Sequence, residues 1–301
     1  MLKKILITGA TGLLGKELVP FLQTRGHEVT VLSTRKIAIP GVKVFVWNVD
    51  LDTIEEGALN GIDTIIHLAG EGIGDKKWTD ERKRKIIDSR VKSSQLLYRT
   101  IKAHDLPIKT FVSASAVGYY GDRNDEFLTE NSAPGSGFLA DCCVKWEAAA
   151  DEGLALGIRV VKIRIGLILS RKGGALAAMA KPIKLFVGAP LGSGKQWMPW
   201  IHLTDIIQLF TKAVEDGEMN GAYNAAAPYP VTNKLLTKRI ASHLGRPVWP
   251  INVPKAVLNL ALGEMSILPL MSSNTVAQKV LDTGYQFKYV DLDEALKEIY
   301  S

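Results

Sequence analysis

The 301-residue chain is 47% hydrophobic and 23% charged, and its formal net charge is +6 at pH 7. This composition is ordinary for a globular protein of one large or two modest domains, and no apolar run is long enough to cross a bilayer, so no membrane partner is expected. The densest basic run, at 82–85, has acidic neighbours and no interleaved aromatic residues, which predicts a solvated helix face and no nucleic-acid partner.

The first predicted element is an apolar strand at 3–8, which runs through a glycine-rich turn into an amphipathic helix. The glycines follow the spacing Gly-x-x-Gly-x-x-Gly, and this order of strand, turn and helix is typical of the phosphate-binding start of a dinucleotide fold. Gly9 permits the turn, Gly12 lets the backbone approach a pyrophosphate, and Gly15 lets the helix pack closely on the sheet. Pro20 predicts a kink near the helix end. The alternative is a plain glycine turn. The residues expected at the phosphates are Gly9, Thr11, Gly12, Leu13, Leu14 and Gly15.

The end of the second strand, predicted at 27–32, bears on the choice of nicotinamide cofactor. An acidic residue about 20 positions past the glycines accepts the ribose 2′-hydroxyl of NAD, whereas an arginine neutralises the 2′-phosphate of NADP. This chain has Ser33, Thr34 and Arg35 there and no acid. The pattern favours NADP(H); the alternative is a solvated loop arginine.

Further strands are predicted at 44–47, 63–70, 109–115 and 159–165, with a long helix at 80–104 and another around 146–150. This rhythm predicts an α/β fold, a Rossmann-type doubly wound parallel sheet. Asp50 either meets the adenine or lies in a turn. His67 is predicted to be a core histidine. The small residues after it indicate a backbone that passes close to a ligand, at Leu68, Ala69, Gly70 and Glu71.

Beyond residue 166 glycines and prolines break the pattern into loops, and regular elements return at 204–215, 222–226, 232–244 and 291–300. We therefore expect an NADP-binding domain at 1–165 with a return segment at 201–230. A smaller α/β substrate-binding lid, made of 166–200 and 231–301, is expected over the carboxyl ends of the strands. Near its mouth we place Trp197, Trp200 and His202, for which core packing is the alternative.

The two cysteines, Cys142 and Cys143, are adjacent and cannot form an ordinary structural disulfide. Neighbouring positions on a helix face apart, so inert burial is favoured over redox sensing. A strand that starts at residue 3 leaves no room for a signal peptide, and the expected location is cytoplasmic. The five scattered histidines show no ligand spacing, so no metal is expected.

Three motifs together resemble the extended short-chain dehydrogenase/reductase superfamily, which includes NAD-dependent epimerases and dehydratases: 8–15, 67–70 and 113–116. More narrowly, the chain resembles the bacterial epimerase-family-protein (YfcH-like) branch, through 68–71, Trp78, 88–91, 113–121, 146–147 and 192–197. Residues 273–296 resemble the C-terminal domain of unknown function of that branch. The resemblance covers essentially the whole chain and implies NADP(H) binding, with Ser113 among the contacts, but no known substrate.

In typical members of this superfamily a tyrosine, paired with a lysine four residues later, transfers a proton, and a serine hydrogen-bonds the substrate oxygen. The resemblance assigns the serine to Ser115 and the lysine to Lys145, but Asp141 stands in the place of the tyrosine. If the helix is instead aligned to the family pattern through Glu147, Leu139 and Cys143 occupy the places of the tyrosine and the lysine, so this alignment provides no tyrosine either. The chain is therefore atypical, and the replacement acid is sought in Tyr119 and Tyr120, with Lys145 and Glu71 as lesser candidates.

Arg90 occupies the region expected for a supporting asparagine. We expect it either to reach the cofactor phosphates or adenine ribose, or to form a surface ion pair with Asp88 or a neighbouring residue.

The sequence thus predicts an NADP(H)-binding oxidoreductase or nucleotide-sugar-epimerase-like enzyme. Its small-molecule substrate would be a carbonyl or sugar-like alcohol held by Ser115 under the lid. The alternative, favoured by the missing tyrosine, is a non-catalytic NADP(H)-binding sensor or partner-binding protein. A homodimer is compatible with the sequence.

Overall fold

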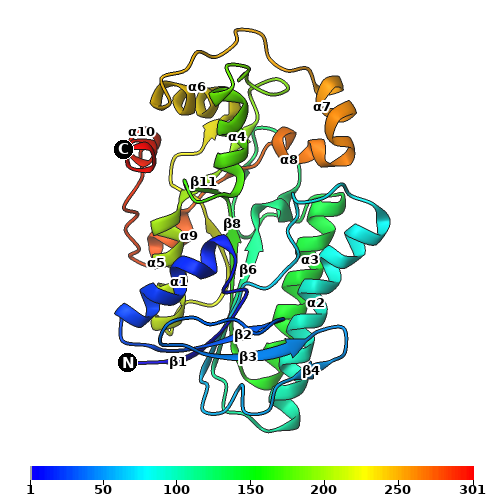
Figure 1. Cartoon of the computed structure of the whole chain (residues 1–301), viewed down its shortest axis with the longest axis vertical. Helices are drawn as coiled ribbons and strands as arrows, with labels where there is room; N and C mark the ends of the chain where they lie inside the picture. Colours follow the sequence, from blue (N-terminus) through cyan, green and yellow to red (C-terminus); the bar gives the residue numbers. More distant parts are fainter. Residues whose placement is uncertain (1) are drawn as a thin grey trace.

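The computed structural model describes residues 2–301. Its centre is an eight-stranded sheet with the order β12-β8-β6-β5-β1-β2-β3-β4, parallel except for the β3–β4 pair (Figure 1). The predicted doubly wound parallel sheet is confirmed. The strands are β1 (Lys4–Thr8), β2 (Glu28–Ser33), β3 (Lys43–Asn48), β4 (Thr53–Ile54), β5 (Thr64–His67), β6 (Thr110–Ala116), β8 (Arg159–Ile165) and β12 (Gly221–Ala225).

Helices cover both faces of this sheet, which is why most of the side chains on its central strands are apolar and buried. Side chains alternate along each strand, so Ile5 and Ile7 of β1 pack in one core with residues of α1 (Leu13–Thr24) and α5 (Leu203–Glu215). Leu6 packs in the opposite core with α2 (Asp80–Ala103) and α3 (Phe138–Asp151). The carboxyl ends of the parallel strands consequently meet at one edge.

The lid residues form a smaller, separate core beyond that edge of the sheet (Figure 1). Three helices contribute residues to this core: α4 (Gly174–Lys184), α6 (Asn233–His243) and α10 (Leu292–Tyr300). The same half of the chain contains α7 (Lys255–Leu262), α8 (Ile267–Leu270) and α9 (Gln278–Asp282), and Val280 of α9 packs in the core beside α1 and α5. The chain also forms three two-stranded pairs: β9 (Leu167–Leu169) with β11 (Trp200–His202), β10 (Trp197–Met198) with β13 (Val231–Thr232), and β7 (Phe127–Leu128) with β14 (Asn274–Thr275). Short 3₁₀ turns lie at η1 (Val117–Tyr120), η2 (Glu152–Leu156) and η3 (Gly263–Ser266).

The structure is more regular beyond residue 166 than the sequence suggested. Gly173 and Gly174 both have positive φ, yet helix α4 starts directly at this pair and runs through the alanine-rich stretch at 175–180. Helix α1 likewise continues through Pro20 to Thr24. Within residues 2–301, none of the helices combines the length and the hydropathy needed to cross a membrane.

Candidate functional site

The turn between β1 and α1 is built by two glycines that the chain itself requires. Gly9 has φ +72°, and a Cβ there would lie 2.7 Å from the carbonyl carbon of Leu68. A Cβ on Gly15 would lie 2.5 Å from the carbonyl oxygen of Gly9. Both distances are shorter than van der Waals contact, so this turn can form only if neither position carries a side chain.

Gly12 is different, because the fold does not require it to be a glycine. A Cβ at Gly12 would meet only the carbonyl oxygen of Gly9, at an ordinary 3.4 Å. The residue is exposed at the N-cap of α1 and, within the described chain, supplies no side-chain cap to the first amides of the helix. Open space beside uncapped helical N–H groups is a site for an anion, and this fits the diphosphate of a dinucleotide.

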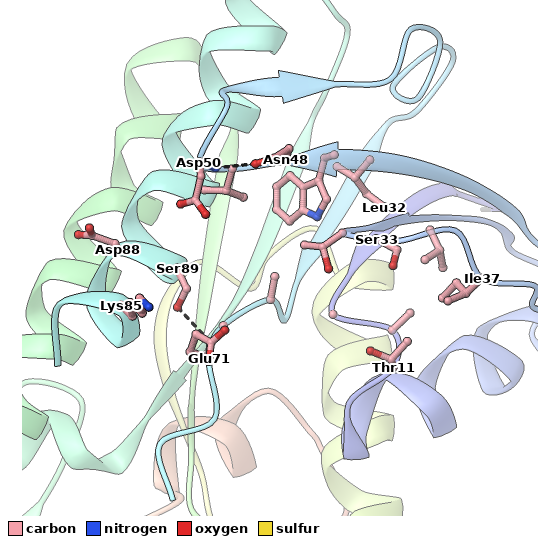
Figure 2. Close-up of a pocket in the computed structure, with 18 residues that line it drawn as sticks. Thr11, Leu32, Ser33, Ile37, Asn48, Asp50, Glu71, Lys85, Asp88 and Ser89 are labelled. Atoms are coloured by element: carbon pink, nitrogen blue, oxygen red, sulfur yellow. Dashed lines mark hydrogen bonds between the residues drawn. The ribbon is translucent and has the colours of Figure 1, made fainter. Parts of the chain in front are cut away.

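A cavity of about 590 Å³ opens beside this turn, where β1, β2, β3 and β5 end (Figure 2). Thr11 and Ser33 lie on one side of it, and Asp50, Lys85 and Asp88 lie on the other. The cavity brings together several of the predicted cofactor residues: Gly9, Thr11, Ser33, Thr34, Ala69, Gly70 and Glu71. Its position at the edge where parallel strands end is the usual one for a ligand of this fold.

Other predicted cofactor residues lie near the cavity without lining it. Leu14, Gly15 and Ser113 are buried in the surrounding structure, and the Ser113 hydroxyl donates to the carbonyl oxygen of Ala114 at 2.8 Å. Gly12, Leu13 and Leu68 flank the glycine turn. Arg35 is exposed directly after Thr34, and its backbone N–H donates to the Ser33 hydroxyl at 3.3 Å.

Arg90 reaches inward from α2 to the end of β5. One of its terminal nitrogens donates to the carbonyl oxygen of Glu71 at 3.1 Å, and its guanidinium carbon lies 3.0 Å from where a Cβ on Gly70 would stand. Within residues 2–301 Arg90 forms no ion pair with Asp88 or another carboxylate, and Asp88 pairs with Lys92 at 2.8 Å. Arg90 is thus placed beside a residue that lines the cavity.

A row of polar side chains crosses the sheet next to this cleft. Ser115 on β6, Arg164 on β8 and Asn224 on β12 are register partners on three neighbouring strands, and all are buried. From α3, Glu147 accepts hydrogen bonds from the Ser115 hydroxyl at 2.7 Å and from two guanidinium nitrogens of Arg164 at 2.8 Å each. The result is a buried ion pair whose carboxylate also holds the serine.

Tyr120 extends this network to the last strand. Its hydroxyl donates to the side-chain oxygen of Asn224 at 2.6 Å and accepts from Arg164 at 2.8 Å. Burial raises the pKa of Tyr120 to about 12, so the phenol stays protonated at neutral pH. Burial opposes the charge of Arg164, but the hydrogen bonds and the charge of Glu147 outweigh it and raise the pKa of the guanidinium.

The four predicted catalytic residues therefore fall into two groups. Ser115 and Tyr120 are engaged with protein partners inside the network. Tyr119 is partly exposed, with its ring 3.5 Å from the Arg164 guanidinium carbon, and within residues 2–301 its hydroxyl has no hydrogen-bond partner. Lys145 is exposed on α3 and forms no ion pair in the same range.

Sequence reasoning did not identify Glu147, Arg164 or Asn224 as parts of one cluster. The available signal was Arg164 itself, a charge inside an otherwise apolar predicted strand, since a buried arginine needs a carboxylate. Its partner comes from a helix 17 residues earlier in the chain. Spacing alone does not reveal that pairing.

Several other side chains have structural roles. His67 is a core histidine, as predicted: its ring nitrogens lie 2.8 Å from the Thr8 hydroxyl and 2.9 Å from the Ser93 hydroxyl, and burial lowers its pKa to about 3. Trp200 is fully buried in the lid core, and His202 caps α5, so neither lines a mouth.

The thiols of Cys142 and Cys143 are both buried. Burial raises the pKa of Cys143 to about 12, so this thiol is protonated at neutral pH, in line with the expected inert burial.

Two protein-family models match this chain, and together they cover most of its length. Residues 5–226 match the model of the NAD dependent epimerase/dehydratase family. The chain belongs to the NAD-dependent epimerase/dehydratase family. Residues 253–299 of this epimerase-family chain also match a domain of unknown function (DUF1731), so the resemblance found in the sequence is confirmed at both ends.

Relatives of this epimerase-family chain span its whole length. Epimerase family protein YfhF of Bacillus subtilis (strain 168) is 37% identical, over 98% of this chain and 97% of the relative. A crystal structure of human epimerase family protein SDR39U1 with NADPH is 33% identical, has a TM-score of 0.87 and covers 99% of each chain. The UDP-glucose 4-epimerase of Thermus thermophilus in complex with NAD, at 17% identity and a TM-score of 0.78 over 99% of this chain and 97% of that one, shares the fold.

Proposed function

We propose that this protein is an NADP(H)-dependent oxidoreductase or epimerase-like enzyme acting on a carbonyl or sugar-like alcohol. When bound, the nicotinamide supplies or accepts a hydride. The observation that carries the proposal is the uncapped, open N-terminus of α1 beside a cavity of about 590 Å³ at the edge where the strands end. The human relative whose crystal structure contains NADPH supports the same cofactor.

The preference for NADP(H) over NAD(H) rests on the end of β2. Ser33 and Thr34 line the cavity, the exposed Arg35 follows, and β2 ends without a carboxylate. A guanidinium and two hydroxyl groups suit a ribose 2′-phosphate, whereas a ribose diol needs an acceptor at this position.

The chain's own contribution to the chemistry is a proton at the substrate oxygen, and we assign it to Tyr119. The Ser115 hydroxyl donates its only proton to Glu147, and Tyr120 has both a donor and an acceptor partner. Tyr119 lies at the same strand end with a hydroxyl free of protein partners among the described residues. The role of Ser115 is then to orient the Glu147 carboxylate. A substrate could interact only with the acceptor lone pairs of the Ser115 hydroxyl, because its proton is already donated to Glu147.

The test is single-turnover oxidation of bound NADPH by a panel of carbonyl compounds and nucleotide sugars, followed by the nicotinamide absorbance. Tyr119→Phe should keep NADPH affinity but lower the rate of hydride transfer by roughly 100-fold, because it removes the proton donor. The matched control is Tyr229→Phe, at an exposed tyrosine of the return segment, which should react like the unaltered protein. Equal rates for Tyr119→Phe and the unaltered protein would remove Tyr119 from the mechanism.

A second candidate function, a non-catalytic NADP(H)-binding sensor, is favoured by one observation: Ser115 and Tyr120 are held by protein partners. Tight NADPH binding without oxidation by any member of the panel would favour this function over the enzyme.

A further inference from the structure

The basic charge of this protein is concentrated in two segments of the lid. Segments 170–200 and 231–262 together contain ten lysines and arginines and not one aspartate or glutamate. The rest of the chain has 27 basic and 31 acidic residues, so it is slightly acidic. The net charge of +6 therefore arises entirely from these two segments.

Most of these lid cations are not neutralised by neighbouring elements. Lys172 pairs with Glu17 on α1, and Arg239 pairs with Asp293 on α10. Within residues 2–301 the other eight form no ion pair: Arg171, Lys181, Lys184, Lys195, Lys234, Lys238, Arg246 and Lys255. This part of the molecule therefore presents a positive surface to solvent.

The same part of the lid exposes large apolar side chains. We call the lid tip the residues Leu185, Phe186, Val187, Trp249 and Ile251, whose exposed fractions run from 54% to 74%. They come from the loop after α4 and from the loop between α6 and α7, which arches over the end of the molecule farthest from β1 (Figure 1). Apolar side chains gathered at one pole of a domain are typical of an interaction surface.

Contacts between the two loops hold the lid tip in shape. The Trp249 indole N–H donates to the carbonyl oxygen of Phe186 at 2.7 Å, and the backbone N–H of Trp249 donates to that of Gly188 at 2.9 Å. The guanidinium carbon of Arg246 lies 4.7 Å from the centre of the Phe186 ring. Phe186 itself has φ +62°, a conformation that costs energy for a residue with a side chain. The apolar surface is therefore held in one conformation by specific contacts, although one residue in it has an unfavourable backbone angle.

We propose that the lid tip docks on an anionic lipid surface, with its apolar side chains in the headgroup region and the lid cations against lipid phosphates. A cluster of aliphatic and aromatic side chains inside a field of unpaired lysines and arginines has the chemistry of a membrane-surface site. The absence of long apolar runs excludes a spanning helix but does not bear on docking at the surface.

Charge and side-chain type favour lipid over other occupants. A second copy would bring another lid with the same unpaired cations, so two lid tips would repel each other. A nucleic acid would match the cations but would leave the aliphatic Leu185, Val187 and Ile251 without a role, because single strands are bound by stacking on aromatic rings. An anionic bilayer satisfies both the charge and the aliphatic surface.

The experiment is co-sedimentation of the full chain with vesicles of neutral phosphatidylcholine, alone or mixed with phosphatidylserine. The protein should sediment with the mixed vesicles only, and less so as salt is added. Lys184→Glu should weaken this binding roughly tenfold or more, because each cation near the membrane surface makes its own contribution to the attraction. Ile251→Ser should weaken it about fivefold or more by removing apolar contact.

Two control variants lie on the sheet half of the molecule. Leu51→Ser changes a side chain that is 71% exposed, against 74% for Ile251, and Lys102→Glu makes the same charge reversal as Lys184→Glu. Both should bind vesicles like the unaltered protein. The proposal is overturned if the mixed vesicles bind no protein, or if tip and control variants lose binding equally. It is also overturned if Ile251→Ser instead dissociates a dimer or releases the protein from DNA. NADPH binding, measured in parallel, reports on the proposed function separately.

Discussion

Replacing Gly12 and Gly15 by alanine, one at a time, separates the needs of the cofactor from those of the fold. At Gly15 the new Cβ would lie 2.5–2.9 Å from backbone atoms of Gly9 and Ala10, which have no flexible end to move aside. Such overpacking costs about 1–3 kcal/mol. At about 2 cal/mol/K of unfolding entropy per residue, a chain of 301 residues loses roughly 1.6 °C per kcal/mol, so Gly15→Ala should lower Tm by about 2–5 °C.

Gly12→Ala should behave in the opposite way. Its Cβ has 3.4 Å of room, and its φ of −73° suits alanine. The poorer N-cap and the less flexible unfolded chain offset each other to within about 1 kcal/mol, so Tm should stay within about 2 °C. The methyl group would nevertheless stand where the backbone meets the diphosphate, and NADPH affinity should fall about tenfold or more.

Differential scanning calorimetry and a fluorescence titration with NADPH measure the two quantities on the same samples. The reasoning is refuted if Gly12→Ala binds NADPH as tightly as the unaltered protein, because the phosphates would then not rest on the tip of α1. A Gly15→Ala protein of undiminished Tm would refute the packing part alone.

Three further predictions concern the cofactor, the buried network and pH. Arg35→Ala should weaken NADPH binding about tenfold to 100-fold and NADH binding little, since a charge-assisted hydrogen bond contributes about 1.5–3 kcal/mol; equal losses in the two titrations would place the 2′-phosphate elsewhere. Glu147→Gln leaves Arg164 charged and buried without its counter-ion, which should lower the free energy of unfolding by about 3–5 kcal/mol. In a thermal melt Tm should fall by about 5–8 °C, and an unchanged Tm would contradict the ion pair. His67 has a pKa of about 3 in the fold against 6.5 as its ordinary value, so below pH 6.5 the unfolded chain binds one proton more. Denaturant unfolding should therefore show stability that is complete above about pH 6.5 and falls by about 1.4 kcal/mol per pH unit towards pH 3, and His67→Gln should flatten that slope.

Local patterns were sufficient to predict the sheet and the glycine turn beside the cavity. The predicted strand at 159–165 and the helix at 80–104 agree with β8 and with α2 to within one residue, because a strand rich in valine and isoleucine and a capped helix leave little choice of structure. The glycine turn was recognisable for the same reason, since φ +72° at Gly9 excludes most residues.

The rest of the site depends on contacts between distant segments. That Ser115 donates to Glu147 follows from how α3 lies on the sheet, and that Tyr120 meets Asn224 follows from β12 joining the sheet 104 residues later. Helix α4 was missed because two glycines outweighed the alanines that follow them. Pairing of this kind is a property of the folded chain, which one-dimensional spacing does not contain.

The buried network around Asn224 also links segments that are far apart in the sequence. Asn224 donates to carbonyl oxygens of Leu128 and Val276, so the sheet and the strands of the lid are joined there through buried bonds. Elsewhere, an exposed ion pair between Lys83 and Glu264 connects α2 to η3, and such pairs contribute little to stability. The two halves of the molecule are therefore joined more firmly through the buried side chain of Asn224 than through this exposed ion pair.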